Sequence, residues 1–173
     1  LFRFVDVSHT ITINDDIAPV LDPAPADLNV ACYADVPVAT DLNWTDNCDG
    51  VGSVSVVEVS SGTTCPEILT RTWTYTDGCG NTATETQLIT INDDIAPVLD
   101  AAPANLSVQC DSDVPAIVSL NWTDNCDGSG SVAGSEVSDG MSCPETITRT
   151  WTYTDGCGNT ATRTQTIVIN DIT

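Results

Sequence analysis

The chain consists of one 78-residue sequence that occurs twice without a gap. Residues 15–92 and 93–170 are identical at 56 of 78 aligned positions. A fixed period of this size indicates small domains in tandem, an arrangement more typical of spacer, adhesive and fibre-forming proteins than of enzymes. The eight cysteines recur with the same period, in the equivalent pairs Cys32 and Cys110, Cys48 and Cys126, Cys65 and Cys143, and Cys79 and Cys157.

The repeat predicts three segments: a strand in residues 1–13, one domain in 14–92 and a second in 93–173. Segment 1–13 takes the place of the final strand of a preceding repeat. A lone apolar strand is poorly tolerated, so we expect it to be paired. Either it belongs to a longer array, or it adds to a sheet edge of the next molecule and builds a polymer head to tail. The candidate inter-subunit residues are Leu1, Phe2, Phe4, Val5 and Val7.

Cysteine content and charge limit the function. A domain of this size buries little surface and commonly depends on disulfides, which form in oxidising compartments and predict an extracellular or cell-surface protein. The 25 acidic residues against four arginines give a net charge of −21, which argues against nucleic acid and anionic membranes as partners. No apolar run is long enough to span a bilayer. No signal peptide is present, so a secreted protein requires that the chain is processed.

The residue pattern predicts an all-β sandwich, because β-branched residues dominate and helical periodicity is absent. In residues 70–76 threonines alternate strictly with larger side chains, which places Arg71, Trp73 and Tyr75 on one face and the four threonines on the other. Glycines in residues 77–81 predict a hairpin turn. The strands expected in the first repeat are 19–21, 28–32, 36–45, 53–60, 67–76 and 82–91, with equivalents 78 residues later.

A count of alternating strands constrains the disulfides. It places the turns containing Cys48 and Cys79 at the end of the domain where the chain comes in. Cys32 and Cys65 fall at the opposite end. This favours the pairs Cys32–Cys65 and Cys48–Cys79, each worth roughly 3–4 kcal/mol in the loop-entropy model. The second repeat would match, with Cys110–Cys143 and Cys126–Cys157.

Three motifs resemble the HYR (hyalin repeat) family in the four-cysteine form of large bacterial surface adhesins. They are residues 18–20, 45–50 and 70–82, and each recurs in the second repeat. The resemblance covers nearly all of residues 15–171. It implies two tandem immunoglobulin-like β-sandwiches with extracellular adhesive and spacer roles, and it carries over no catalytic residues.

Acidic residues at the turns and linkers suggest a calcium site. The strand count brings oxygen-bearing side chains of the turns to the same end as the linker, and Ca²⁺ takes 6–8 oxygen ligands. The linker also resembles the Asp/Asn-Ala-Pro junction of cadherin repeats. The alternative is that these residues only stabilise turns. The candidate ligands are Asn14, Asp15, Asp16, Asp46, Asp49, Asp77, Asn81, Asn92, Asp93, Asp94, Asp124, Asp127, Asp155 and Asn159.

Other chemistry finds less support. The acceptor pattern for N-linked sugars occurs at Asn43, Asn105 and Asn121, although an ordinary outward Asn explains it equally. The tryptophans could stack on sugars, but their strand positions favour the core. We expect no enzyme, because nucleophile elbows and phosphate-binding loops are missing and the only histidine, His9, precedes the repeats.

These observations predict a structural repeat unit of an extracellular or cell-surface adhesin or fibre. It would form a stiff acidic rod or filament by end-to-end stacking with copies of itself or neighbouring repeats. The alternative is an adhesive module that binds glycan or protein through loops at one end of the sandwich.

Overall fold

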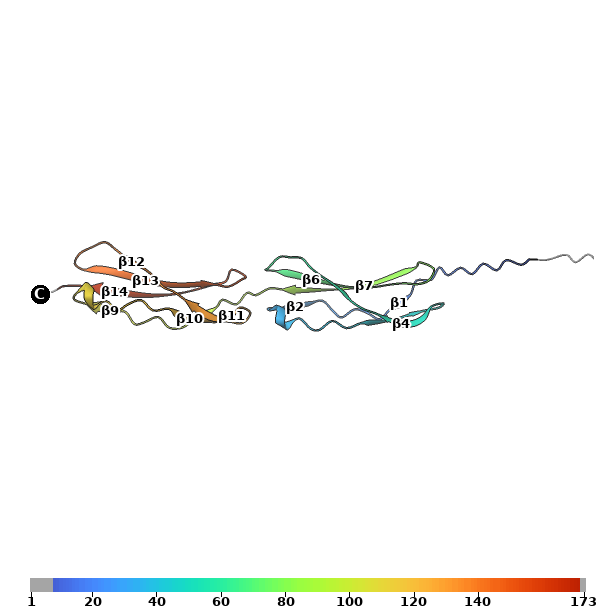
Figure 1. Ribbon diagram of the computed structural model, residues 1–173, viewed down its shortest axis with the longest axis horizontal. Helices are drawn as coiled ribbons and strands as arrows, with labels where there is room; N and C mark the ends of the chain where they lie inside the picture. Colours follow the sequence, from blue (N-terminus) through green and yellow to red (C-terminus); the bar gives the residue numbers. More distant parts are fainter. Residues whose placement is uncertain (1–7, 172–173) are drawn as a thin grey trace, which may run out of the picture. The chain divides into compact units, whose positions relative to one another are not determined.

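The computed structural model describes residues 8–171 and contains two copies of one β-sandwich (Figure 1). In the first sandwich a three-stranded sheet has the order β1-β3-β4, and a four-stranded sheet has the order β2-β7-β6-β5. The strands are β1 (Val20–Leu21), β2 (Leu28–Val30), β3 (Leu42–Asp46), β4 (Gly50–Val54), β5 (Val57–Ser60), β6 (Glu67–Thr76) and β7 (Thr82–Ile91).

The second sandwich repeats this topology, with sheets β8-β10-β11 and β9-β14-β13-β12. Its strands are β8 (Val98–Leu99), β9 (Leu106–Val108), β10 (Leu120–Asp124), β11 (Gly128–Val132), β12 (Ser135–Ser138), β13 (Glu145–Thr154) and β14 (Thr160–Ile169). A short 3-10 helix follows the second strand of each sandwich: Tyr33–Asp35 and Asp111–Asp113.

The alternation in β6 builds the core of the first sandwich, as predicted. Trp73 is 0% exposed and packs with Leu21, Leu42 and Trp44. The Trp44 ring stacks on Tyr75 with ring centroids 3.7 Å apart. The threonines of β6 point the other way, because successive side chains of a strand face opposite sides. The all-β class and the tandem sandwiches are therefore confirmed.

Two predicted strands were wrong in their bounds. Residues 36–41 are not a strand, and β3 begins only at Leu42. The predicted strand 53–60 is two strands, β4 and β5, which belong to different sheets. The sequence carries a signal of this crossing, because the alternation of valines changes phase between Val56 and Val57, directly before β5.

The described chain divides into two compact units that do not coincide with the repeats. The first comprises the described residues up to Asp27 together with 37–59 and 69–88. The second comprises 28–36, 60–68 and the chain from Ile89 onward. The end of the first sandwich that carries Cys32 and Cys65 therefore belongs to the same compact unit as the second sandwich.

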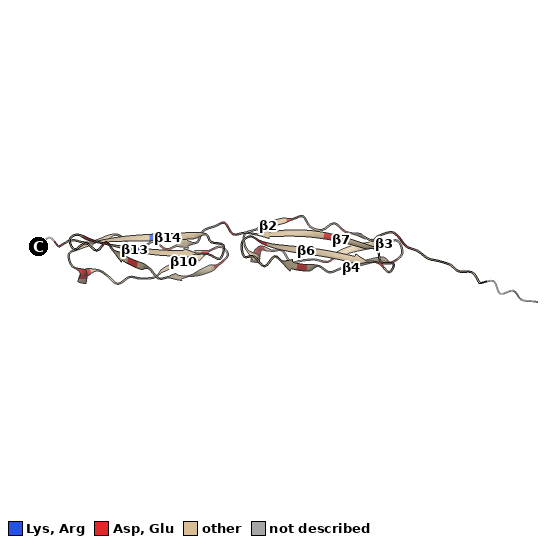
Figure 2. Cartoon of the chain, turned by 90° about the horizontal axis from the view of Figure 1, so that it is seen from above, with Lys and Arg blue, Asp and Glu red and all other residues tan. Residues whose placement is uncertain are grey.

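Residues 8–14 contain neither helix nor strand, and Ile11 and Ile13 are 84% and 85% exposed. The predicted inter-subunit residues Leu1 to Val7 lie outside the described residues. Acidic residues occur in both sandwiches (Figure 2). Within residues 8–171 we find no helix of the length and apolar character needed to cross a bilayer.

Candidate functional site: paired cysteines and carboxylate clusters

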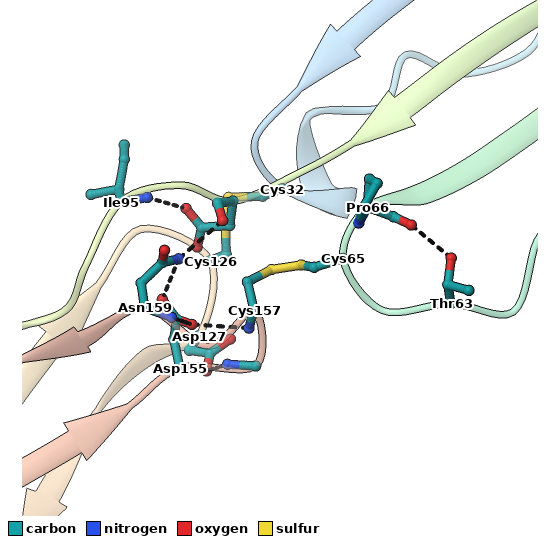
Figure 3. Close-up of a disulfide and its surroundings, with 12 residues drawn as sticks. Cys32, Thr63, Cys65, Pro66, Ile95, Cys126, Asp127, Asp155, Cys157 and Asn159 are labelled. Carbon is teal, nitrogen blue, oxygen red and sulfur yellow. Dashed lines mark hydrogen bonds between the residues drawn. A yellow bond between two sulfur atoms is a disulfide. The ribbon is translucent and has the colours of Figure 1, made fainter.

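Two disulfides join residues of the second compact unit. Cys32 is bonded to Cys126 and Cys65 to Cys157, with Cα atoms 5.2 Å and 5.3 Å apart (Figure 3). Cys32 follows β2, and Cys65 lies in the loop between β5 and β6. Cys126 and Cys157 lie in the turns β10–β11 and β13–β14. Each bond therefore connects the first repeat to the second.

The predicted pairs Cys32–Cys65, Cys48–Cys79, Cys110–Cys143 and Cys126–Cys157 are wrong in this structure. Cys32 is bonded to Cys126 instead of Cys65, and Cys157 is bonded to Cys65 instead of Cys126. Both bonds therefore run between the two repeats. The physical reason is that a strand count assigns each cysteine to an end of its own sandwich. It cannot tell whether a cysteine at that end bonds its neighbour or the facing end of the next repeat.

The remaining four cysteines, Cys48, Cys79, Cys110 and Cys143, are unpaired and exposed in the described chain. We call the end of a sandwich with the turns β3–β4 and β6–β7, or their equivalents, its leading end. We call the end with the segment after β2 and the β5–β6 loop, or their equivalents, its trailing end. Cys48 and Cys79 lie at the leading end of the first sandwich, and Cys110 and Cys143 at the trailing end of the second.

Three carboxylates converge at the leading end of the first sandwich. Asp15, Asp46 and Asp77 each offer one oxygen, and these oxygens all lie within 4.8 Å of one another. Asp15 precedes β1, Asp46 ends β3 and Asp77 follows β6, so three separate segments position the group. Asp93, Asp124 and Asp155 form the same arrangement in the second sandwich.

The carboxylates also order the cysteine-bearing turns. Asp46 Oδ1 accepts hydrogen bonds from the backbone N–H groups of Cys48 and Asp49, both at 2.8 Å. Asp77 Oδ1 accepts from the N–H groups of Cys79 at 2.9 Å and Asn81 at 2.8 Å. These are Asx-type turns, in which a side chain replaces a backbone acceptor. The turn role considered from the sequence is therefore present in the structure.

One buried carboxylate oxygen of each cluster lacks a hydrogen-bond partner. Among the described residues, Oδ2 of Asp46 and Oδ2 of Asp124 are buried without a hydrogen-bond partner. A buried carboxylate oxygen without a partner carries a large desolvation cost. The same orphan oxygen thus occurs at equivalent positions of both repeats.

Asparagine amides border the first cluster. Asn47 Nδ2 donates to Asp15 Oδ1 at 3.1 Å, and Asn81 Nδ2 donates to the Asp15 backbone carbonyl at 3.0 Å and to Asp77 Oδ2 at 2.8 Å. A half-turn of either amide exchanges its nitrogen and oxygen and presents an acceptor to the cluster. Three carboxylates, two amide oxygens and one carbonyl would then supply six oxygens, which matches the lower limit of calcium coordination.

Hydrogen bonding shifts the acidity of these groups. The amide of Asn47 holds the pKa of Asp15 below its ordinary value. Burial by itself would raise the pKa of Asp77, but hydrogen bonds from Asn81, Cys79 and Gly80 outweigh it and the pKa is lowered. The hydrogen bond to Asp15 raises the pKa of the Cys48 thiol. Asp15 and Asp77 are therefore ionised next to a protonated Cys48 thiol at neutral pH.

The structure brings together only part of the predicted ligand set. Asp15, Asp46 and Asp77 meet with Asn81, and Asp93, Asp124 and Asp155 meet with Asn159. Asp49 Oδ2 instead accepts from Tyr75 Oη at 3.1 Å and Gly78 N at 2.8 Å, and Asp127 does the same in the second repeat. Asn14, Asp16, Asn92 and Asp94 are exposed and outside both clusters. The prediction did not include Asn47, although it belongs to the repeated turn motif.

The candidate glycosylation residues lie on the surface. Asn43 and Asn121 donate through Nδ2 to Asp22 and Asp100, at 2.9 Å and 3.0 Å. Asn105 Oδ1 accepts from the backbone of Thr166. All three side chains are exposed, and their glycosylation stays a prediction.

The geometry defines a class of protein: tandem immunoglobulin-like β-sandwich repeats joined by disulfides. A comparison with protein families matches residues 20–91 and 98–169, each to the HYR-like domain with four cysteines. The chain therefore belongs to this family, whose members are extracellular, adhesion-type repeat modules. A search of the curated proteins found no match.

Proposed function

We propose that the chain is a structural unit of an extracellular fibre or surface adhesin, which extends a linear array by joining repeats end to end. The observation that carries this proposal is the pair of disulfides between consecutive repeats, Cys32–Cys126 and Cys65–Cys157. Two covalent bonds in addition to the peptide linker restrict rotation between neighbouring repeats. A binding protein would have no need for such a joint, whereas a load-bearing array benefits from it.

Immunogold labelling of native cells with an antibody against this chain tests the proposal. Gold particles should follow extended structures outside the cell at a regular spacing. Labelling confined to the cell interior, or to isolated single molecules, would contradict it. Binding of the soluble chain to a glycan array, lost when the leading-end loops are changed, would favour the alternative adhesive module.

We also propose that calcium stiffens the array by binding at the carboxylate clusters. The support is the orphan oxygen of Asp46 and its equivalent in Asp124, each beside two further carboxylates. A cation there would satisfy the buried oxygen and neutralise part of the net charge of −21. Sites of this extracellular kind bind calcium with a Kd of roughly 10⁻⁴–10⁻³ M.

Calcium at 10–100 times its Kd is expected to stabilise each sandwich by about 1.4–2.7 kcal/mol, with EDTA reversing the effect. Differential scanning calorimetry of the chain in EDTA and in calcium measures this as a rise in Tm. The double variant Asp46→Asn/Asp124→Asn should lose the response. The charge-matched control Asp35→Asn/Asp111→Asn, which changes two exposed residues outside the clusters, should keep it. An identical melt in calcium and EDTA would sink the calcium proposal and leave the structural proposal standing.

A further inference from the structure

The disulfides use one set of cysteines and leave its complement unpaired. In each bond a trailing-end cysteine of the first repeat meets a leading-end cysteine of the second. The four unpaired residues are the leading-end cysteines of the first repeat, Cys48 and Cys79, and the trailing-end cysteines of the second, Cys110 and Cys143. The four unpaired cysteines thus comprise both halves of the same joint, a leading-end half on the first repeat and a trailing-end half on the second.

The unpaired leading end is built like the paired one. The backbone N–H of Cys48 donates to Asp46 Oδ1 at 2.8 Å, and that of Cys126 donates to Asp124 Oδ1 at 2.9 Å. Cys79 and Cys157 likewise each donate to the aspartate two residues earlier, both at 2.9 Å. At this end the cysteines, their turns and their carboxylates are all repeated, so the surface that receives Cys32 and Cys65 exists a second time.

The unpaired trailing end presents its cysteines in the same backbone conformation. Cys32 caps the helix Tyr33–Asp35 with φ −116° and ψ 153°, and Cys110 caps Asp111–Asp113 with φ −127° and ψ 152°. The loops that carry Cys65 and Cys143 are closed by equivalent backbone hydrogen bonds, Ser61 N to Ile68 O and Asp139 N to Thr146 O.

Exposure separates used from unused cysteines. Cys32 is 9% exposed, and Cys65, Cys126 and Cys157 are half-buried, whereas all four unpaired cysteines are exposed. The Asn125 amide adds a contact to the joint, with Nδ2 3.6 Å from Cys32 Sγ. Its equivalent Asn47 is already beside Cys48, with Nδ2 3.1 Å from the thiol sulfur. The unpaired leading end therefore already has the asparagine that borders the bonded cysteine of the joint.

The sequence separations fix which cysteines would meet. The two bonds join residues 94 and 92 positions apart. If a second copy continues the array in the same register, it begins two repeat lengths further on. The separation of 94 then places the copy's Cys48 opposite Cys110, and the separation of 92 places its Cys79 opposite Cys143. Both pairs form in the same register, because the equivalent cysteines of the two repeats in each chain are 78 residues apart.

We propose that the trailing end of this chain binds the leading end of a second copy and forms two disulfides with it, Cys110–Cys48 and Cys143–Cys79. This inference rests on the proposed structural function and adds its covalent chemistry and its partner. The product is a head-to-tail polymer in which every joint, within and between chains, has the same two bonds. The occupant we propose is a second copy, because it carries the complementary half of the joint that is formed inside this chain.

Each bond forms by two-electron oxidation of two thiols. With a low-molecular-weight disulfide such as oxidised glutathione, one thiolate attacks and releases one reduced glutathione. The partner thiolate then attacks the mixed disulfide and releases the second. Two protein thiols and one oxidised glutathione thus give one protein disulfide and two reduced glutathiones. In an oxidising compartment a dithiol–disulfide oxidoreductase supplies the same oxidising equivalent.

Complementary variants test the direction of joining. Cys48→Ser/Cys79→Ser removes the leading-end thiols and Cys110→Ser/Cys143→Ser the trailing-end thiols, without touching the four bonded cysteines. After treatment with oxidised glutathione, non-reducing electrophoresis of the unchanged chain should show a ladder that dithiothreitol collapses to monomer. Each variant alone should stay monomeric. Their mixture should give a dimer and no longer species, because the outer ends of that dimer carry serine.

Peptide mapping by mass spectrometry, with one variant labelled with nitrogen-15, should find Cys48 linked to Cys110 and Cys79 linked to Cys143, each between labelled and unlabelled chains. Bonds Cys48–Cys79 and Cys110–Cys143 within one chain would overturn the proposal. So would dimers formed by either variant alone, or native material in which Cys48 is linked to a peptide of another sequence. Extracellular fibres without these links would overturn this inference alone. If electrophoresis shows the expected ladder of disulfide-linked polymers but immunogold particles lie inside the cell, only the proposed function is overturned.

Discussion

The variant Trp73→Ala is expected to lose about 3–5 kcal/mol of the free energy of unfolding of the first sandwich. Trp73 is 0% exposed and fills the space between the two sheets. Its Nε1 donates to the carbonyl of Thr40 at 2.9 Å, so truncation leaves both a cavity and an acceptor without its donor. A sandwich of this size has little stability to lose. Urea unfolding monitored by circular dichroism measures the change.

The chain supplies two matched comparisons for this experiment. Thr74→Ala changes the next residue, whose exposed side chain points away from the core, and should alter stability by no more than about 0.5 kcal/mol. Trp151→Ala removes the equivalent of Trp73, also 0% exposed, with Nε1 donating to Val118. It should destabilise the second sandwich by a similar amount. If Trp73→Ala and Thr74→Ala have the same free energy of unfolding, the Trp73 ring is not the centre of the core.

Long strands with strict alternation were predictable because burial of one face imposes a period of two. This holds for β6 and for its hairpin with β7, whose turn at residues 77–81 has the expected glycines. Gly80 has φ 96°, a backbone conformation that favours glycine. The bounds of the strands in the middle of the repeat were less predictable. The short strand β1, in contrast, was expected at 19–21 and is found at Val20–Leu21, where it pairs with β3.

The sequence predicted at which end of the sandwich the candidate site lies. It did not predict which cysteines form disulfides there. The strand count brought the turn aspartates Asp46 and Asp77 to the same end as the linker residue Asp15, and in the structure these three carboxylates meet. It also separated Cys48 and Cys79 from Cys32 and Cys65. The disulfide pairing then depended on whether the cysteines of a repeat bond within that repeat or to those of the next repeat. Both answers satisfy the same period, so the repeat alone could not decide between them.

For the buried Arg71, too, the sequence predicted the position of the side chain but not its partners. The sequence placed Arg71 on the inner face of β6, beside Trp73. It gave no sign that a charge could be accommodated there. In the structure the guanidinium is only 4% exposed and donates through Nε to Glu58 at 2.8 Å, through Nη1 to Gln87 at 3.3 Å and through Nη2 to the carbonyl of Pro37 at 2.5 Å. Three separate segments must be in place before the charge is compensated.

The variant Arg71→Met should therefore destabilise the first sandwich by roughly 3 kcal/mol, although methionine retains much of the apolar volume. The reason is that Gln87, itself 4% exposed, and the carbonyl of Pro37 lose their donor inside the protein. Glu58 is 39% exposed and can be hydrated, so Glu58→Gln should cost far less. Urea unfolding of both variants separates the loss of the buried network from the loss of the ion pair.

Arg163→Met is the control, because Arg163 is exposed on β14 and should change stability by less than about 0.5 kcal/mol. Arg149→Met should reproduce the large loss in the second sandwich. There the same bonds recur to Glu136 at 2.7 Å, Gln165 at 3.4 Å and the carbonyl of Pro115 at 2.6 Å. If Arg71→Met and Arg163→Met have equal effects, the buried guanidinium contributes no more than an exposed one. A common loss at Arg71 and Arg149 would instead mean that each sandwich is stabilised by its own buried arginine network.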